Sequence, residues 1–170
     1  NTHALYLNTT DAIYDYANFT NDTSPTSAVF TVGGSNDQAN PDGSTMVAYC
    51  FAEKQGYSKF GSYEGNGNAN GPYVHLGFKP AFLITKPIDA ADNWNMFDNK
   101  RLAFNSATSP FAITSNTSDL ETTDTHQLDF LSNGFKINNS GNTVNRTSTF
   151  IYWAFAENPF VTSTGVPATA

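Results

Sequence analysis

The best candidate for paired-carboxylate chemistry is Glu53 with Glu157, because each residue ends an apolar run. General acid and base catalysis needs two such groups held together at one cleft. Parallel neighbouring strands would bring the two carboxylates close together, whereas antiparallel neighbours would place them at opposite ends. The other interpretation is that each Glu marks where an apolar strand reaches the surface, and we favour it.

The histidines and the cysteine do not form the pattern of a nucleophilic or zinc site. His3, His75 and His126 are the only histidines, and no nucleophile motif accompanies them. His75 lies in the alternating run 73–78 and is expected on the more polar face of a strand. Cys50 is the only cysteine, so an internal disulfide is excluded, and its apolar neighbours predict a small buried hydrophobe. We therefore predict no catalytic residues, no metal site and no enzyme.

Two clusters of Asp and Asn residues could bind calcium, because carboxylate and amide oxygens are calcium ligands. Neither cluster follows the EF-hand pattern, and Asp and Asn are ordinary turn residues. We therefore predict no cofactor, with calcium as the alternative. The clusters consist of Asp89, Asp92, Asn93, Asn95, Asp98 and Asn99, and of Asp37, Asn40 and Asp42.

The glycine-rich stretch 65–71 alternates Gly with Asn. It has no Lys-Ser/Thr pair and no helix start behind it, which excludes a phosphate loop and predicts a flexible loop tip. Aromatic rings near it could stack on a sugar or a protein while amides form hydrogen bonds. The alternative is that these rings pack in the core or at its rim. The candidate ligand-binding residues are Tyr57, Tyr63, Asn66, Asn68, Tyr73 and Trp94.

The composition predicts the fold that must position these residues. The chain has 170 residues, of which 14% are charged and 14% aromatic. Its polarity comes mainly from Asn, Thr, Ser and Gly, which favour turns and strand faces over helix interiors. We expect one all-β domain over residues 1–170, an antiparallel β-sandwich of jelly-roll or lectin-like type with long polar loops. Residues 163–170 are expected to form a loose tail.

The charge pattern excludes whole classes of partner. The net charge is −7, and the eight Lys and Arg residues are scattered from Lys54 to Arg146, so the sequence lacks the basic stripe of a nucleic-acid binder. No apolar run approaches the roughly 20 residues of a membrane span. The chain starts at Asn1, and the strand-like run Leu5-Tyr-Leu7 follows at once, so we expect a fragment of a longer chain.

Two apolar runs have nearly the same sequence. Val47–Glu53 and Ile151–Glu157 follow one pattern and share Phe-Ala-Glu. Near-continuous apolar runs are typical of strands covered on both faces. We therefore expect both runs near the centre of a sheet, side by side, with Phe155 in the core. The full set of expected strands is 28–32, 45–53, 58–64, 73–78, 81–85, 94–98, 127–130, 134–137 and 149–157. The turn residues Leu131-Ser-Asn133 predict a hairpin between 127–130 and 134–137, and the Ser/Thr/Asn-rich stretch 105–125 is expected to wrap the surface.

An ordered set of motifs runs through most of the chain from Ala28 to Phe160. They are Met46-Val-Ala-Tyr-Cys-Phe-Ala-Glu53, Gly56-Tyr-Ser-Lys-Phe-Gly-Ser-Tyr63, Gly65-Asn-Gly-Asn-Ala-Asn-Gly-Pro72, Leu76-Gly-Phe-Lys-Pro-Ala-Phe-Leu83, Asp129-Phe-Leu-Ser-Asn-Gly-Phe-Lys136 and Ile151-Tyr-Trp-Ala-Phe-Ala-Glu157. Together they resemble an uncharacterised domain family of tail-fibre-like and other structural proteins of aquatic bacteriophages. The resemblance implies a component of the virion surface with an adhesive role, and it supplies no catalytic residues.

Three functions follow as hypotheses. The first is a tail-fibre or receptor-binding module that recognises a host-surface glycan or protein. The second is a capsid decoration or other structural protein that binds only virion partners, and the third is a glycan-cleaving enzyme. By family analogy we expect a homo-oligomer, often a trimer. An adhesin should present aromatic and amide groups on loop tips, whereas a decoration protein should present an apolar patch for docking.

Overall fold

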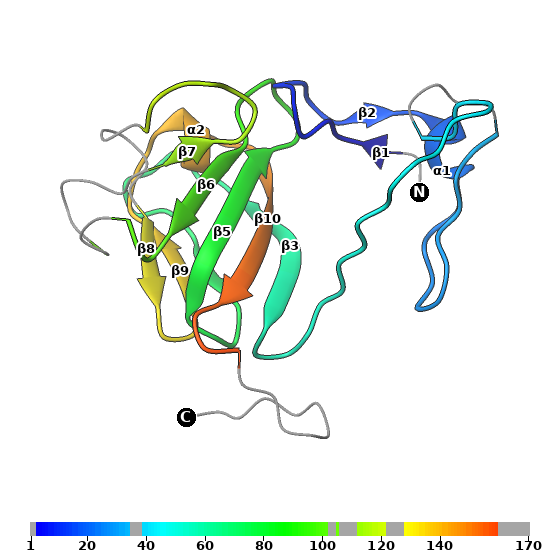
Figure 1. The fold of residues 1–170 in the computed structure, drawn as a ribbon. Helices are drawn as coiled ribbons and strands as arrows, with labels where there is room; N and C mark the ends of the chain where they lie inside the picture. Colours follow the sequence, from blue (N-terminus) through cyan, green and yellow to red (C-terminus); the bar gives the residue numbers. More distant parts are fainter. Residues whose placement is uncertain (1–2, 35–38, 102–104, 106–111, 122–127, 160–170) are drawn as a thin grey trace.

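The computed structural model describes residues 3–34, 39–101, 105, 112–121 and 128–159. Within these ranges the protein is all-β, with three antiparallel sheets and two helices of four residues each (Figure 1). Two of the sheets pack as an antiparallel sandwich, which confirms the expected fold class. No helix of the described residues is long and apolar enough to cross a membrane. Predictions for Asp37, His126, the tail 163–170 and residues 106–111 and 122–125 of the stretch 105–125 lie outside the described residues.

The larger sheet has the strand order β3-β10-β5-β6-β7, and every neighbouring pair is antiparallel. Aromatic and β-branched residues dominate its central strand β10, as expected for a pleated sheet surface. Four of the five strands fall on or close to stretches that the sequence predicted, and the short β7 does not. They are β3 (Ser58–Glu64), β10 (Thr149–Ala156), β5 (Pro80–Pro87), β6 (Asn95–Asp98) and β7 (Ile113–Thr114).

The smaller sheet has the order β4-β9-β8. Its strands are β4 (Tyr73–His75), β9 (Gly134–Ile137) and β8 (Leu128–Leu131). Leu131 pairs with Gly134, so residues 132 and 133 form a two-residue hairpin loop. This hairpin is the one that the sequence predicted.

The core lies between the two sheets and is largely aromatic. The ring of Phe135 from β9 lies 5.8 Å from Tyr63 of β3 and 5.6 Å from Tyr152 of β10, both edge-on. Tyr63 stacks in turn on Phe150, with ring centroids 5.0 Å apart. Phe135 and Phe150 are fully buried. Each such ring contributes roughly 1.5–3 kcal/mol by burial, so these contacts fix the two sheets face to face.

Residues 3–34 and 39–57 form an N-terminal arm that extends beside the sandwich (Figure 1). The arm contains the short pair β1 (His3–Ala4) and β2 (Tyr14–Asp15), followed by the helix α1 (Ala17–Thr20). The other helix, α2 (Asn142–Asn145), belongs to the sandwich and buries Val144 and Asn145. The chain therefore has a compact part and an extended part.

Four expectations about the arm and about residues 151–157 are wrong. Residues 28–32 and 45–53 are not strands, and Cys50 is exposed rather than buried. Of the two Phe-Ala-Glu runs only β10 is central, between β3 and β5. Phe155 lies partly exposed on the outer face of the sheet, because the side chains of β10 that face the core are Phe150, Tyr152 and Ala154. An apolar run becomes a buried strand only where other strands lie on both sides of it.

Candidate functional site

An aromatic surface covers the outer face of the five-stranded sheet. Along β10 the side chains alternate, so Ile151, Trp153 and Phe155 point away from the core and are partly exposed. Phe60 of β3 lies directly opposite Trp153, and their rings are 6.4 Å apart. Phe82 of β5 lies opposite Phe155, with rings 6.2 Å apart. This outer face is therefore an apolar surface suited to binding: the sheet fixes its rings in place, and their side chains remain partly exposed to solvent.

The arm supplies further rings to this face. Phe51 lies 6.1–6.2 Å from the rings of Phe60, Trp153 and Phe155. Tyr57 adds an edge-on contact with Phe155 at 6.4 Å. Phe51 is nevertheless 59% exposed. The arm thus touches one end of the aromatic face without covering it.

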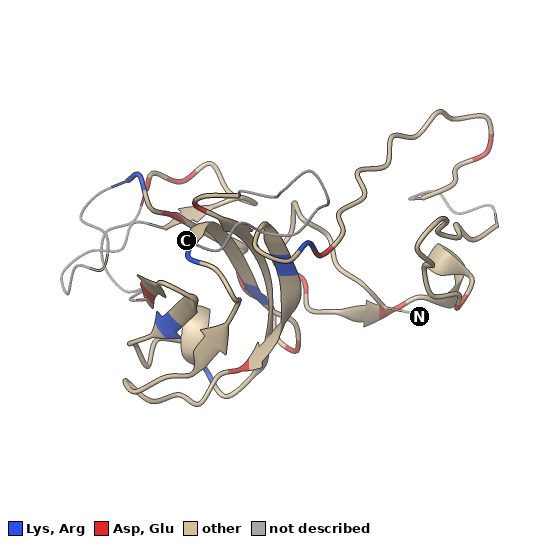
Figure 2. Ribbon diagram, turned by 90° about the horizontal axis from the view of Figure 1, so that it is seen from below, with Lys and Arg blue, Asp and Glu red and all other residues tan. Residues whose placement is uncertain are grey.

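Beyond Phe51 the arm carries apolar side chains directly into solvent. Val47 is 74% exposed and Tyr49 84% exposed, and Met46 is also exposed. Residues 43–52 contain no charged side chain, and Figure 2 shows this uncoloured stretch between acidic residues. Contiguous exposed apolar surface of this kind is typical of a docking site.

The backbone of this segment is also available. No backbone–backbone hydrogen bond joins residues 45–53 to another described residue. The last backbone pairing with the sheet is an antiparallel bridge between Lys54 and Ser58, and the Ser58 hydroxyl also donates to the Ala52 carbonyl at 2.9 Å. Towards residue 45 the chain runs away from β3 (Figure 1). Chain with unpaired N–H and C=O groups and apolar side chains can add as a strand to another sheet.

A hollow of about 390 Å³ lies between two parts of the arm. Residues 25–30 form one wall and residues 50–52 the other. None of these residues is charged, and Val29 and Phe30 are exposed next to it. The hollow has the size of a small ligand site, and it could take a large apolar side chain of a partner.

Residues 6–13 of the arm are held to the sandwich by hydrogen bonds. Ile13 N–H donates to the Ile88 carbonyl at 2.6 Å, and Asp92 N–H donates to the Thr10 carbonyl at 2.8 Å. The indole N–H of Trp94 donates to the carbonyl of Tyr6 at 2.8 Å. These bonds fix residues 6–13 against the sheet, so the arm leaves from a defined place.

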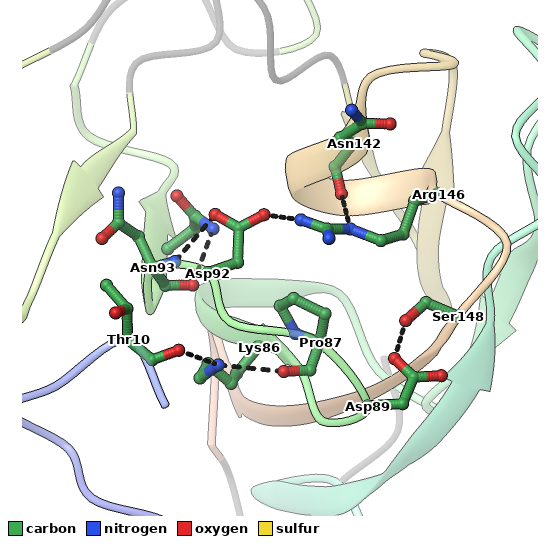
Figure 3. Close-up of polar contacts among 10 residues, drawn as sticks. Thr10, Lys86, Pro87, Asp89, Asp92, Asn93, Asn142, Arg146 and Ser148 are labelled. Carbon is green, nitrogen blue, oxygen red and sulfur yellow. Dashed lines mark hydrogen bonds and ion pairs between the residues drawn. The ribbon is translucent and has the colours of Figure 1, made fainter. Parts of the chain in front are cut away.

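Lys86 is the most unusual side chain at this junction, because its residue is fully buried. Its ammonium group donates to the carbonyls of Thr10 at 3.2 Å and Pro87 at 3.0 Å (Figure 3). No described carboxylate forms an ion pair with it. Burial, and then the charge of Arg146, lower the pKa of Lys86, while Asp11 opposes the shift. Sequence reasoning missed this residue, although a lysine within an apolar strand was a signal.

The carboxylates of the cluster between Asp89 and Asn99, which suggested calcium, have protein partners. Asp92 forms an ion pair with Arg146, and Asp89 accepts a hydrogen bond from the Ser148 hydroxyl (Figure 3). Asp98 pairs with Arg101. Burial disfavours the charged form of Asp98, but hydrogen bonds from the backbone and side chain of Arg101 outweigh it and hold the pKa below its usual value. Among the described residues no group of three or more His, Cys, Asp or Glu side chains could hold a metal ion.

The glutamates that suggested catalysis do not have equivalent positions. Glu157 follows the end of β10 and forms an ion pair with Lys79 at 2.7 Å. A hydrogen bond from Lys79 lowers the pKa of Glu157, and Asn99 donates a second bond at 2.7 Å. Glu53 lies exposed on the arm. Glu157 is therefore the end of a strand, as we favoured, whereas Glu53 ends no strand.

The six candidate ligand residues do not form one surface. Tyr63 and Trp94 are buried, and their polar atoms donate to Val144 and Tyr6 within the protein. Burial also raises the pKa of Tyr63. Tyr57 lies on the aromatic face described above. Tyr73 is 45% exposed on β4 of the smaller sheet, where its hydroxyl donates to Asn133 Oδ1 at 2.8 Å.

Asn66 and Asn68 lie in the glycine-rich loop, which is held by a buried residue that the sequence did not reveal. Asn145 is fully buried, its Oδ1 accepts from Asn66 N–H at 2.8 Å, and its Nδ2 donates to the carbonyl of Asn68 at 2.6 Å. Gly67 N–H donates to the Asn145 carbonyl at 2.6 Å, and Gly67 has a φ of +64°, which favours glycine. The loop is thus fastened to α2, contrary to the expected flexible tip.

Residues 1–159 match the family described as Domain of unknown function (DUF7483). The chain belongs to this family. The match spans the arm as well as the sandwich, so the apolar segment is part of the family domain. No curated protein and no solved structure matches the chain.

Proposed function

We propose that the chain is a non-catalytic structural module of a bacteriophage virion surface, of the tail-fibre-like kind, and that its N-terminal arm attaches it to a protein partner. The observation that carries this proposal is the exposed, uncharged apolar segment of residues 45–52. The order of motifs that resembles phage structural proteins supports the virion as its location.

The arm favours a protein partner over a sugar or a nucleic acid. Sugar sites present rings together with hydrogen-bonding groups, whereas residues 46–51 present Met, Val, Tyr and Phe with few polar atoms. An acidic chain with scattered cations does not attract nucleic acid. An unpaired backbone beside apolar side chains suits strand addition to a protein sheet.

The ion pairs that three carboxylates form within the protein support a function without catalysis. Glu157, Asp92 and Asp98 are each bound to a cationic side chain. The pKa values of Glu157 and Asp98 lie below their usual values, which disfavours the protonated form that a general acid needs. Incubation of the protein with host-derived polysaccharide should leave the chain length of the polysaccharide unchanged. Shortened chains would contradict the proposal and revive a glycan-cleaving enzyme.

The attachment role is tested by incorporation into particles. The variant Val29→Asp/Tyr49→Asp places two charges on the arm and should be lost from purified particles. Leu120→Asp is the matched control, since Leu120 is 90% exposed and lies outside the arm. Equal incorporation of both variants would contradict attachment through the arm. A density map of particles that carry the unmodified protein assigns its position: density on tail tips indicates a fibre, and density on capsid lattice points indicates a decoration protein.

Receptor binding is the second candidate, because one exposed ring stands among polar groups at the smaller sheet. The Tyr73 hydroxyl lies 3.3 Å from Nδ1 of His75 and binds the amide of Asn133. Rings with neighbouring amides suit the recognition of a host glycan or protein. A glycan array should then show binding that Tyr73→Ala abolishes and Tyr57→Ala leaves intact. Reproducible silence across host-derived glycans would count against glycan adhesion.

A further inference from the structure

Strand β3 has one occupied edge and one open edge. The edge of β3 that points to the middle of the sheet pairs with β10, with Phe155 opposite Ser58 and Trp153 opposite Phe60. At its other edge no described strand pairs with it: the contacts there are the bridge between Lys54 and Ser58, a hydrogen bond from the Ser58 hydroxyl to the Ala52 carbonyl at 2.9 Å, and the ring contact of Phe51 with Phe60. An open edge with unpaired backbone groups is a template for another strand.

The arm contains a segment whose sequence already suits β3. Residues 47–53 repeat the pattern of 151–157, and 151–156 form most of the strand that pairs with β3. In the register that β10 uses, Phe51 would lie opposite Ser58 and Tyr49 opposite Phe60. Directly opposite residues lie on one face of a sheet, so Tyr49 would extend the aromatic row of Phe60 and Trp153.

The chain cannot form this pairing with its own β3 while the present turn is kept. The bridge of Lys54 with Ser58 sets a hairpin register that places Phe51 opposite Gly61. Gly61 pairs with Tyr152, which faces the core, whereas the Phe51 ring lies on the outer face against Phe60 and Trp153. A change of face requires a shift of one residue in register, so the segment leaves β3 instead of closing on it.

We infer that the partner of the open β3 edge is residues 47–53 of a second copy of this chain. The turn at residues 54–57 opens, and each copy gives its segment to the other in the register of β10. This deepens the proposed attachment function and rests on it, since it treats the arm as a docking surface. The exchange is reciprocal, so it closes as a symmetric dimer rather than growing without limit. The segment is uncharged from 47 to 52, so the net charge of −7 does not oppose the contact locally.

A pair of engineered cysteines separates exchange from closure within one chain. Cys50 is the only cysteine, and the exchanged register places it opposite Lys59, whereas the hairpin register places it opposite Ser62. Opposed residues of an antiparallel pair are about 4.5–5.5 Å apart at Cα, which a disulfide spans. Under mild oxidation the full chain carrying Lys59→Cys should form a covalent dimer on a non-reducing gel, and Ser62→Cys should remain without a bond. Cys50→Ser/Lys59→Cys is the control and should run as a single chain on the same gel, because it lacks the second thiol of the disulfide.

Light scattering of the unmodified chain provides the second measurement. The mass should rise from one chain to two with concentration, Tyr49→Asp should abolish the rise, and Val29→Asp should leave it unchanged. An intrachain disulfide in Ser62→Cys would overturn the exchange in favour of a closed hairpin. A single-chain mass at all concentrations with no Lys59→Cys dimer would also overturn it. Attachment would survive either result if Val29→Asp/Tyr49→Asp were still lost from particles.

Discussion

Two regions of this protein have nearly the same sequence and opposite environments. Residues 151–157 form most of β10, with strands on both sides, whereas residues 47–53 run through solvent on the arm. In β10 the side chain of Ala154 is fully buried, and at the matching position Cys50 is exposed. The difference comes from the neighbours, because the two runs share the same pattern of apolar residues.

The comparison shows what the surroundings contribute to a strand. β3 and β5 satisfy both backbone edges of β10, and the smaller sheet covers its inner face through Phe135. The arm segment has neither an edge partner nor a covering sheet among the described residues. Apart from the Ala52 carbonyl, which accepts from the Ser58 hydroxyl, its backbone therefore lies open, and the exposed side chains of Val47 and Tyr49 remain available for a partner.

The largest expected effect comes from removing a core ring of β10. Phe150→Ala should lower the free energy of unfolding by about 3–5 kcal/mol, because it leaves a cavity beside Tyr63. Tyr49→Ala on the arm is the matched variant and should leave the stability of the isolated monomer unchanged. Denaturant titration measures both, and equal losses would show that the Tyr49 ring on the arm is buried as deeply as the core ring of Phe150.

A smaller loss should follow from removing the amide that holds the glycine-rich loop. Asn145→Leu keeps the volume but leaves the carbonyls of Asn68 and Asn139 and the N–H of Asn66 without this partner. The free energy of unfolding should fall by about 1–3 kcal/mol, the cost of unsatisfied buried polar groups. Thermal melts compare it with Asn68→Ala, which should cost little because Asn68 is exposed. An unchanged melting temperature would mean that the loop does not depend on Asn145.

Phe155 sharpens the comparison from the outer face of β10. Since its side chain is only partly buried, Phe155→Ala should cost roughly 1–2 kcal/mol, less than Phe150→Ala. Denaturant midpoints measured under the same conditions rank the two variants. A loss for Phe155→Ala as large as that for Phe150→Ala would show that the outer face is covered.

The smallest expected effect is a dependence of stability on pH through Lys86. Its pKa in the folded protein lies below the usual 10.5, so between these values the unfolded chain binds the proton and the folded chain does not. The free energy of unfolding should therefore rise as pH increases through this window and be lowest below it. Lys86→Met removes this contribution, and the difference between the two pH series isolates it from tyrosine titration. Parallel pH series would contradict a lowered pKa.

The sequence predicted the sandwich better than it predicted the surface. Alternation and turn residues located β3, β6 and the hairpin of β8 with β9, because local pattern and tertiary environment agree there. The same reasoning failed for 45–53, since a run of apolar residues does not reveal whether a sheet edge is present beside it. Asn145 gave no signal in a chain rich in Asn, as its burial depends on a loop distant in sequence.

Hydrogen exchange measured segment by segment is the most direct test of the contrast between the two runs. At a concentration where light scattering gives the mass of one chain, amides of residues 47–53 should exchange as fast as those of an unstructured peptide. Amides of 149–156 should be protected up to the global free energy of unfolding. Protection of residues 47–53 in the monomer, equal to that of β10, would contradict an unpaired arm segment and the docking role built on it.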